Sequence, residues 1–283
     1  KASAIYQQIL EQRDLAWARL GTGIIAYYQR NHQQAAAIFQ QVISAHPIFL
    51  ESYDWLSKTY EELDQTDKAE NTIIRATEIS PNSFFRQKQL ALLTTQTGNL
   101  KIAEQAYLAV IELGKYSVHK SPADFSGLAK VYYKTEKNDE VLLTLDSMRQ
   151  QFPDNHEAEL RATSLETEVF KKIGNTSRSQ QAFEKTMELH VEQKKRIPKE
   201  LQLDVARACY LNSEGQLAND IIHSLIFNHS DDKAFMLSIE QMQADLGQEN
   251  NSRQLIQTAK KELVQINNKG VQLFQQNKIT QAL

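Results

Sequence analysis

Residues 53–81 read YDWLSKTYEELDQTDKAENTIIRATEISP, and this stretch decides the fold. The residues that form its ladder before Pro81 are Tyr53, Leu56, Ser57, Tyr60, Ala69, Ile73 and Ala76. Pro47 lies 34 residues before Pro81, and Gly23, Ala35 and Phe39 precede it at matching offsets. The chain therefore repeats its pattern of small and large residues with a period of 34.

That period, closed by a proline, is typical of the tetratricopeptide repeat, a helix–turn–helix unit. The sequence thus predicts an all-α fold, a tetratricopeptide-repeat α-solenoid with at least twelve helices. We expect a right-handed superhelix of antiparallel helix pairs, in which each repeat covers the apolar face of its neighbour. Since helices approach closely where small residues meet large ones, Ala69 and Ala76 should be buried, facing Leu56 and Tyr60.

We expect one solenoid over residues 1–283. Its predicted parts are a partial repeat 1–14, repeats at about 15–48, 49–82, 83–116 and 121–154, irregular pairs over 155–265, and a truncated repeat 266–283. The link Gly114–Lys120 starts the fourth repeat about four residues late. Further on, Gly215–Leu217 should turn into a helix Ala218–Phe227, and Asp231 should cap a helix Lys233–Leu246.

The two ends of the sequence lead to predictions about the parent protein and about self-association. Because each falls within a repeat, we expect the parent protein to continue in both directions. Half-repeats leave apolar surface uncovered, so self-association is expected through the terminal helices. The residues expected to make that contact are Tyr6, Ile9, Leu273 and Phe274.

Composition excludes several classes of partner. The net charge of −3 predicts neither nucleic-acid nor membrane binding, and no apolar run approaches the roughly 18 residues that span a bilayer. Cys209 is the only cysteine, so no intrachain disulfide can form, and a cytoplasmic location is the natural interpretation.

The sequence offers no pattern for catalysis, so we expect no enzyme, no cofactor and no metal site. The seven histidines lack ligand spacing with one another or with Cys209. Asp231-Asp232 fits helix capping better than metal binding. Cys209 lies among apolar residues and is expected to be a buried small hydrophobe.

Four segments resemble the repeat region of bacterial response regulators that join a receiver domain to tetratricopeptide repeats. They are WARLG (17–21), YDWLSKTYE (53–61), ELGKYSVHKSPADF (112–125) and INNKGVQLFQQNKITQAL (266–283). The resemblance implies the output or partner-binding part of a phosphorelay. No receiver can be placed in this chain, so that family's phosphorylation residues are not carried over. The alternative is a general adaptor or assembly scaffold unrelated to phosphorelay.

A protein or peptide partner is expected on a concave face. In the repeat family at large, fixed positions of each first helix line an inner groove. Transferred by phase, the candidate residues are Tyr27, Tyr28, Asp54, Lys58, Glu61, Glu62, Phe85, Lys88, Gln96, Lys130, Tyr133 and Lys134, together with Trp17, Ile24, Glu51 and Ser126. Aromatic area beside charges suits a peptide groove.

The transfer of these positions makes one testable prediction about exposure, and two other interpretations of the same residues stay open. The residues expected to be at least partly exposed are Tyr27, Tyr28, Lys58, Glu62, Lys88 and Lys134. Alternatively, Trp17 and Ile24 pack on the preceding repeat, and the charged face is merely solvated. Leu20, Ile24 and Asp54 occupy positions where some chaperone adaptors hold a C-terminal carboxylate, so that activity is not expected.

Overall fold

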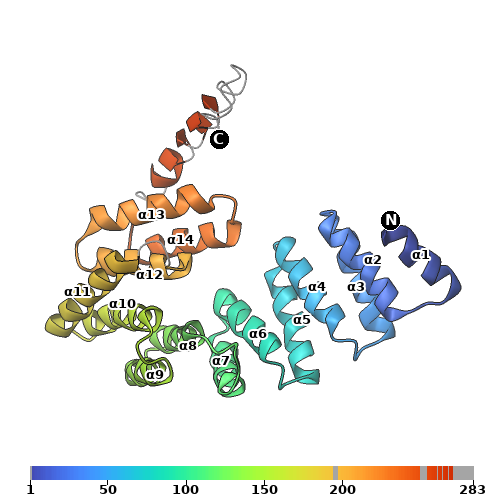
Figure 1. The fold of residues 1–283 in the computed structure, drawn as a ribbon, viewed down its shortest axis with the longest axis horizontal. Coiled ribbons are helices and arrows are strands. Elements are labelled where there is room, and N and C mark those ends of the chain that lie inside the picture. The colour runs from blue at the N-terminus through green and yellow to red at the C-terminus, as the bar shows by residue number, and fades with distance from the viewer. Residues whose placement is uncertain are drawn as a thin grey trace. The chain divides into compact units, whose positions relative to one another are not determined.

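The computed structural model describes residues 2–193, 197–248, 254–259, 261–262, 264–266 and 268–269. Throughout these residues the regular structure is α-helical, which confirms the all-α class and the stacking of helix pairs (Figure 1). The chain divides into two compact units, Lys1–Leu145 and Asp146–Leu283. Each unit has its own hydrophobic core, so each is described separately below. The repeat boundaries and the handedness of the superhelix stay predictions.

Unit 1 consists of successive helices that pack side by side. They are α1 (Ala2–Gln12), α2 (Ala16–Tyr28), α3 (His32–Ala45), α4 (Glu51–Glu62), α5 (Thr66–Ile79), α6 (Phe84–Thr97), α7 (Leu100–Gly114), α8 (Pro122–Lys134) and the start of α9 (Asn138–Gln151). The pairs α2 with α3, α4 with α5 and α6 with α7 are joined by contacts of α3 with α4 and α5 with α6. From α1 to α8, each helix therefore packs against the next one along the chain.

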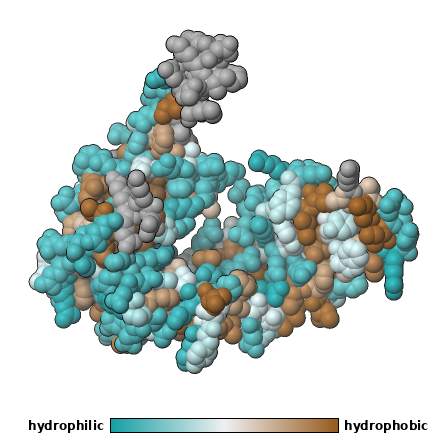
Figure 2. Space-filling view, in the orientation of Figure 1, coloured by the Kyte–Doolittle hydropathy of each residue, from teal (hydrophilic) through white to brown (hydrophobic). Residues whose placement is uncertain are grey.

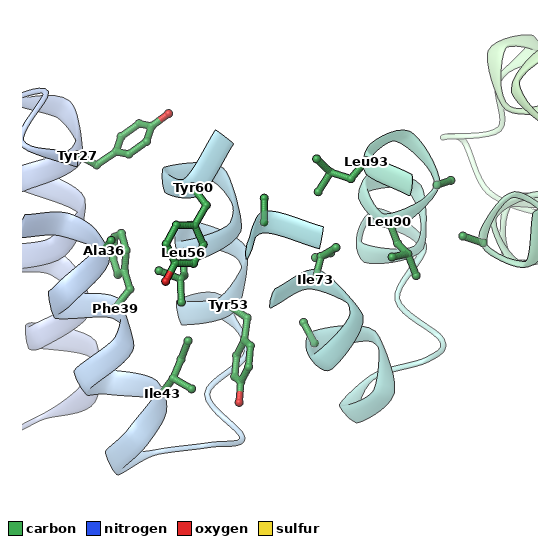
Figure 3. Packing of buried hydrophobic residues seen from close by; sticks show 14 of the residues in the cluster. Tyr27, Ala36, Phe39, Ile43, Tyr53, Leu56, Tyr60, Ile73, Leu90 and Leu93 are labelled. Atoms are coloured by element: carbon green, nitrogen blue, oxygen red, sulfur yellow. The ribbon is translucent and has the colours of Figure 1, made fainter. Parts of the chain in front are cut away.

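The core of unit 1 places small residues against large ones, as the ladder predicts. Ala69 and Ala76 are fully buried in a cluster that also contains Leu56 and Tyr60. Figure 3 shows Leu56 and Tyr60 of α4 within this cluster. At Gly23 of α2, an added Cβ would lie 2.5 Å from the Phe39 ring of α3. The absence of a side chain at this position is therefore what allows the two helices to approach.

Left-handed residues mark the turn between the two helices of each pair. Arg30, Asp64 and Gly98 have positive φ angles and lie 34 residues apart. Glu136 follows Gly98 after 38 residues, so the delay of about four residues expected from the 114–120 link is present. These turns give the repeat phase independently of the prolines.

Unit 2 continues with longer and less regular helices. They are α10 (His156–Lys172), α11 (Thr176–Gln193), α12 (Lys199–Leu211), α13 (Gly215–His229) and α14 (Lys233–Asp245). Helices α10 with α11 and α12 with α13 form pairs, and α10 also packs on α12. Its core includes Leu201, Ile222, Ile226 and the sole cysteine, Cys209.

Two expectations about helix starts in unit 2 were wrong. Gly215 begins α13 instead of forming the preceding turn, which is made by residues 212–214 with Ser213 at a φ of 66°. The N-cap of α14 is Asp232, and not Asp231: its Oδ1 accepts a 3.0 Å hydrogen bond from the backbone N–H of Phe235. Adjacent aspartates have equal capping propensity, so spacing alone did not distinguish them. The expected contact residues Leu273 and Phe274 lie outside the described residues.

Candidate protein-binding face

We call the side chains at the predicted groove positions of α2, α4, α6 and α8 the first-helix face. On α4 these positions lie opposite the buried residues Tyr53, Leu56 and Tyr60, because successive residues of a helix are about 100° apart. Glu51, Lys58, Glu61 and Glu62 are exposed, and Asp54 is partly exposed. The sequence phase therefore separates the core side of α4 from its outer side correctly.

An aromatic cluster joins α2 to α4 on this face. The ring of Tyr28 lies edge-on to Tyr27 and Trp55, with centroids 5.6 and 6.0 Å apart. The Lys58 ammonium lies 5.5 Å from the Tyr27 centroid and 5.4 Å from that of Trp55, within range of cation–π attraction. Tyr28 is 72% exposed, so this cluster fixes a large aromatic surface facing solvent.

The expectation that Tyr27 is exposed was wrong. Its side chain is buried, at 8% exposure, because Trp55 and His32 pack edge-on against its ring. Its hydroxyl donates a 3.1 Å hydrogen bond to Glu62 Oε1. Burial and this bond to a carboxylate raise the pKa of Tyr27 to about 12. Tyr27 therefore supports the exposed Tyr28 from behind.

The other five residues in that test are at least partly exposed: Tyr28, Lys58, Glu62, Lys88 and Lys134. Trp17 is 51% exposed although its ring lies edge-on to Tyr6 of α1, 6.3 Å between centroids. Ile24 is partly buried against the core of unit 1.

Several charged candidates bond the first helix of one repeat to that of the next. Arg86 of α6 donates through Nε and Nη2 to both oxygens of Asp54 on α4, at 2.8 and 2.7 Å. Lys88 of α6 pairs with the buried Asp124 of α8 at 2.7 Å. Gln89 donates a long hydrogen bond of 3.4 Å to Glu61 Oε1. These side chains stabilise the stack and are less available to a ligand.

Farther along the face, α6 and α8 carry the remaining candidates. Phe85 is 65% exposed and lies edge-on to His119 of the 114–120 link, 5.0 Å between centroids. Gln96 is exposed, Lys130 and Tyr133 are partly buried, and Ser126 is buried. The candidate list omitted Leu92, which is 55% exposed and occupies the ninth position of the third first helix. The phase alone could have identified it.

The described residues contain few side-chain arrangements suited to catalysis or metal binding. They contain no group of three or more histidine, cysteine or acidic side chains able to hold a metal ion. Cys209 is fully buried, as predicted, and burial raises the pKa of its thiol to about 12. Among the helices placed in the structure, none combines the length and apolarity required to traverse a bilayer.

Comparisons with known proteins agree with this architecture. Residues 17–47 and 50–83 each match a tetratricopeptide repeat model. A search of curated protein sequences finds no significant match.

Three solved structures illustrate the fold. A tetratricopeptide repeat protein from Parabacteroides merdae is 15% identical, with 91% of this chain and 90% of that one covered and a TM-score of 0.57. YrrB, described as a TPR protein with an unusual peptide-binding site, is 13% identical, with 69% and 96% covered and a TM-score of 0.56. MamA is 17% identical, with 61% and 96% covered and a TM-score of 0.51. At these identities the likeness concerns the fold, and the chain is similar to tetratricopeptide-repeat solenoids.

Proposed function

We propose that this chain is a protein-interaction module that binds a segment of a partner protein on the first-helix face. The single observation that carries the proposal is the exposed Tyr28, which Tyr27 and Trp55 hold in place. A rigid, exposed aromatic ring supplies contact area at little entropic cost, as is typical of binding hot spots. Hydrophobic side chains also gather over the N-terminal helices of unit 1 in Figure 2.

The charges around Tyr28 favour a particular kind of segment. Glu51 and Glu62 are exposed on α4, whereas Gln89 already bonds to Glu61 and Arg86 already neutralises Asp54. Lys58 lies against the Tyr27 and Trp55 rings on the same side of α4. A segment with a basic residue next to an apolar one complements this arrangement, since the carboxylates fix register and the rings supply area.

Structures of the same fold support protein or peptide partners. YrrB is described as having a peptide-binding site. A further neighbour with a TM-score of 0.52 is the structure of Naa15/Naa10 bound to HypK-THB, 14% identical, with 84% of this chain and 35% of that one covered. By analogy, this chain acts by binding and not by catalysis.

Within that function, the role as output part of a two-component phosphorelay response regulator rests on the segments that resemble such proteins. The alternative is a general adaptor or assembly scaffold. Sequencing the parent gene upstream of this chain separates them: a receiver domain favours the former, and a signal peptide or membrane anchor favours the latter and contradicts a cytoplasmic location.

Peptide arrays test the binding face. The full chain is applied to immobilised peptides in which basic and apolar residues are combined systematically. Tyr28→Ala should abolish capture of the preferred peptides. Tyr116→Ala is the matched control, because Tyr116 lies in the 114–120 link and is 93% exposed. Equal capture by both variants would show that Tyr28 is not part of the site.

A further inference from the structure

Unit 1 has a surface pocket of about 480 Å³ that is separate from the first-helix face. It lies among α3, α4 and α5, and its lining residues are Gln40, Ile43, Ser44, Pro47, Tyr53, Leu56, Tyr60, Thr72 and Arg75. The α4 residues that line it point to the opposite side of that helix from Lys58. The pocket is therefore a second site and not an extension of the aromatic cluster.

The floor of the pocket is apolar. Ile43 reaches from α3 toward Leu56 and Tyr53 of α4 in Figure 3, and all three side chains are buried. The Tyr53 hydroxyl donates to the Pro47 carbonyl at 3.0 Å, so this ring is fixed in place. Such a floor suits an aliphatic side chain. A volume near the lower end of the usual range for ligand pockets admits one or two residues, and not a helix.

The rim, by contrast, presents hydrogen-bond donors. The Tyr60 hydroxyl accepts from Gln40 Nε2 at 2.5 Å, which leaves its own hydrogen for another acceptor. The exposed Arg75 guanidinium lies over the Tyr53 ring, 5.5 Å from its centroid. Lys68, one helical turn from Thr72, lies 5.6 Å from the Tyr60 ring centroid.

Asp67 is adjacent to Lys68 and Glu78 lies three residues after Arg75 on α5, but neither carboxylate pairs with these cations in the described part of the chain. Helix α3, HQQAAAIFQQVISA, contains no acidic residue. Lys68 donates only to the neutral Gln65, and within the described part of the chain neither Lys68 nor Arg75 has a carboxylate at ion-pair distance. The lining cation Arg75, the Tyr60 phenol and Lys68 beside the Tyr60 ring favour an anion attached to an apolar group.

We infer that this pocket binds an acidic side chain, together with an adjacent aliphatic one, from an extended segment of a partner protein. Arg75 receives the carboxylate in its forked geometry, and Tyr60 donates the supporting hydrogen bond. The aliphatic neighbour lies on Ile43 and Leu56. Unit 1 thus offers surfaces of opposite preference on the two sides of α4: a basic segment on the first-helix face and an acidic one in the pocket.

The test uses NMR on the isotope-labelled full chain with two short blocked peptides of glycine and serine. One carries a central Leu-Glu pair and the other a Leu-Gln pair. The Leu-Glu peptide should shift the amide signals of Ser44, Thr72 and Arg75, and the Leu-Gln peptide should not. Equal shifts with both peptides, shifts confined to the first-helix face, or no shifts at millimolar peptide would each overturn the inference.

Variants locate the interaction and separate it from the proposed function. Arg75→Gln should weaken Leu-Glu binding at least about tenfold, the size expected for a lost charge-assisted hydrogen bond. Lys101→Gln removes an equal charge from an exposed position of α7 and should change nothing. Ser44→Tyr, also at an exposed position, should fill the pocket and block binding. Tyr28→Ala should leave binding intact; if Lys101→Gln or Tyr28→Ala weakens it as much as Arg75→Gln, the site is elsewhere.

Discussion

Gly23 is a residue at which the fold tolerates little change. An alanine Cβ there would lie 2.5 Å from the Phe39 ring, so α2 and α3 must separate or the ring must leave its place. We expect Gly23→Ala to lower the free energy of unfolding by about 1–3 kcal/mol, the usual cost of overpacking, despite the higher helix propensity of alanine.

Urea denaturation followed by circular dichroism provides the measurement. Gly215→Ala is the matched control, because Gly215 is also helical but has no neighbouring atom within 4 Å of an added Cβ. That variant should be as stable as the parent or slightly more stable. If Gly23→Ala behaves like Gly215→Ala, the close approach at Phe39 does not exist in solution.

Asp232 should give unit 2 a pH-dependent contribution to stability. Its carboxylate pairs with Lys199 and caps α14, and both bonds lower its pKa below the ordinary 3.8. A depressed carboxyl pKa stabilises the fold fully above the ordinary value, and this stabilisation is lost as pH falls below 3.8 through the lower folded value. Asp232→Asn retains a capping oxygen but loses the ion pair.

Thermal melts of the parent and Asp232→Asn from pH 7 downward measure this contribution. The parent should melt at the higher temperature at pH 7, and the difference should shrink below pH 3.8 as Asp232 is protonated in the parent. A difference independent of pH would assign the effect to capping geometry and not to the charge.

For individual residues, the sequence predicted which side chains are buried better than it predicted which backbone conformations the turn residues adopt. The buried Ala69, Ala76 and Cys209 follow from periodicity, because it reports which side of a helix faces the core. The left-handed turn residues Arg30 and Asp64 carry no glycine signal. Aspartate tolerates this conformation but arginine does not favour it, so the residue types did not mark the two turns alike.

At the scale of elements, side-chain bonds between first helices add to the apolar core that holds neighbouring repeats together. The bidentate Arg86–Asp54 pair joins α6 to α4, and its side chains are only 17% and 35% exposed. Arg86→Ala should lower the free energy of unfolding by roughly 1–3 kcal/mol, since it leaves Asp54 without its partner. The expected loss of unfolding free energy is moderated because the Asp54 carboxylate stays partly hydrated.

A charge swap distinguishes the pair from packing by the arginine stem. Asp54→Arg and Arg86→Asp should each destabilise unit 1 in denaturant titrations, and the double variant should regain part of the loss. Additive losses in the double variant would mean that the two side chains act independently. Neither outcome bears on which residues occupy the first-helix face.

The candidate face could be predicted in position but not in availability. Phase correctly placed Lys58, Glu62 and Phe85 outside the core. It did not reveal that Tyr27 is covered by Trp55, or that Asp54 and Lys88 are used between repeats. Those facts depend on residues 28 to 36 positions away, and a consensus for one repeat contains no such information.

For the whole molecule, the two separate cores predict two unfolding transitions. Ile73 is fully buried in unit 1 and Ile222 is fully buried in unit 2. In a stack where contacts are mainly between neighbours, cooperativity weakens with distance along the array. Calorimetry of Ile73→Ala and Ile222→Ala should lower a different transition in each case, by an amount equivalent to about 2–5 kcal/mol. One shared transition, lowered alike by both variants, would contradict this.

The bonds between successive first helices also make the order of the repeats specific. A tyrosine–glutamate bond joins α2 to α4, an arginine–aspartate pair joins α4 to α6, and a lysine–aspartate pair joins α6 to α8. Each junction between successive first helices thus has its own pair of complementary side chains. Duplicating or transposing a 34-residue block would set mismatched groups against each other, so the array cannot be lengthened or shuffled as freely as its regular helices suggest. Repeats of the same shape thus differ in the side chains that match them to their neighbours.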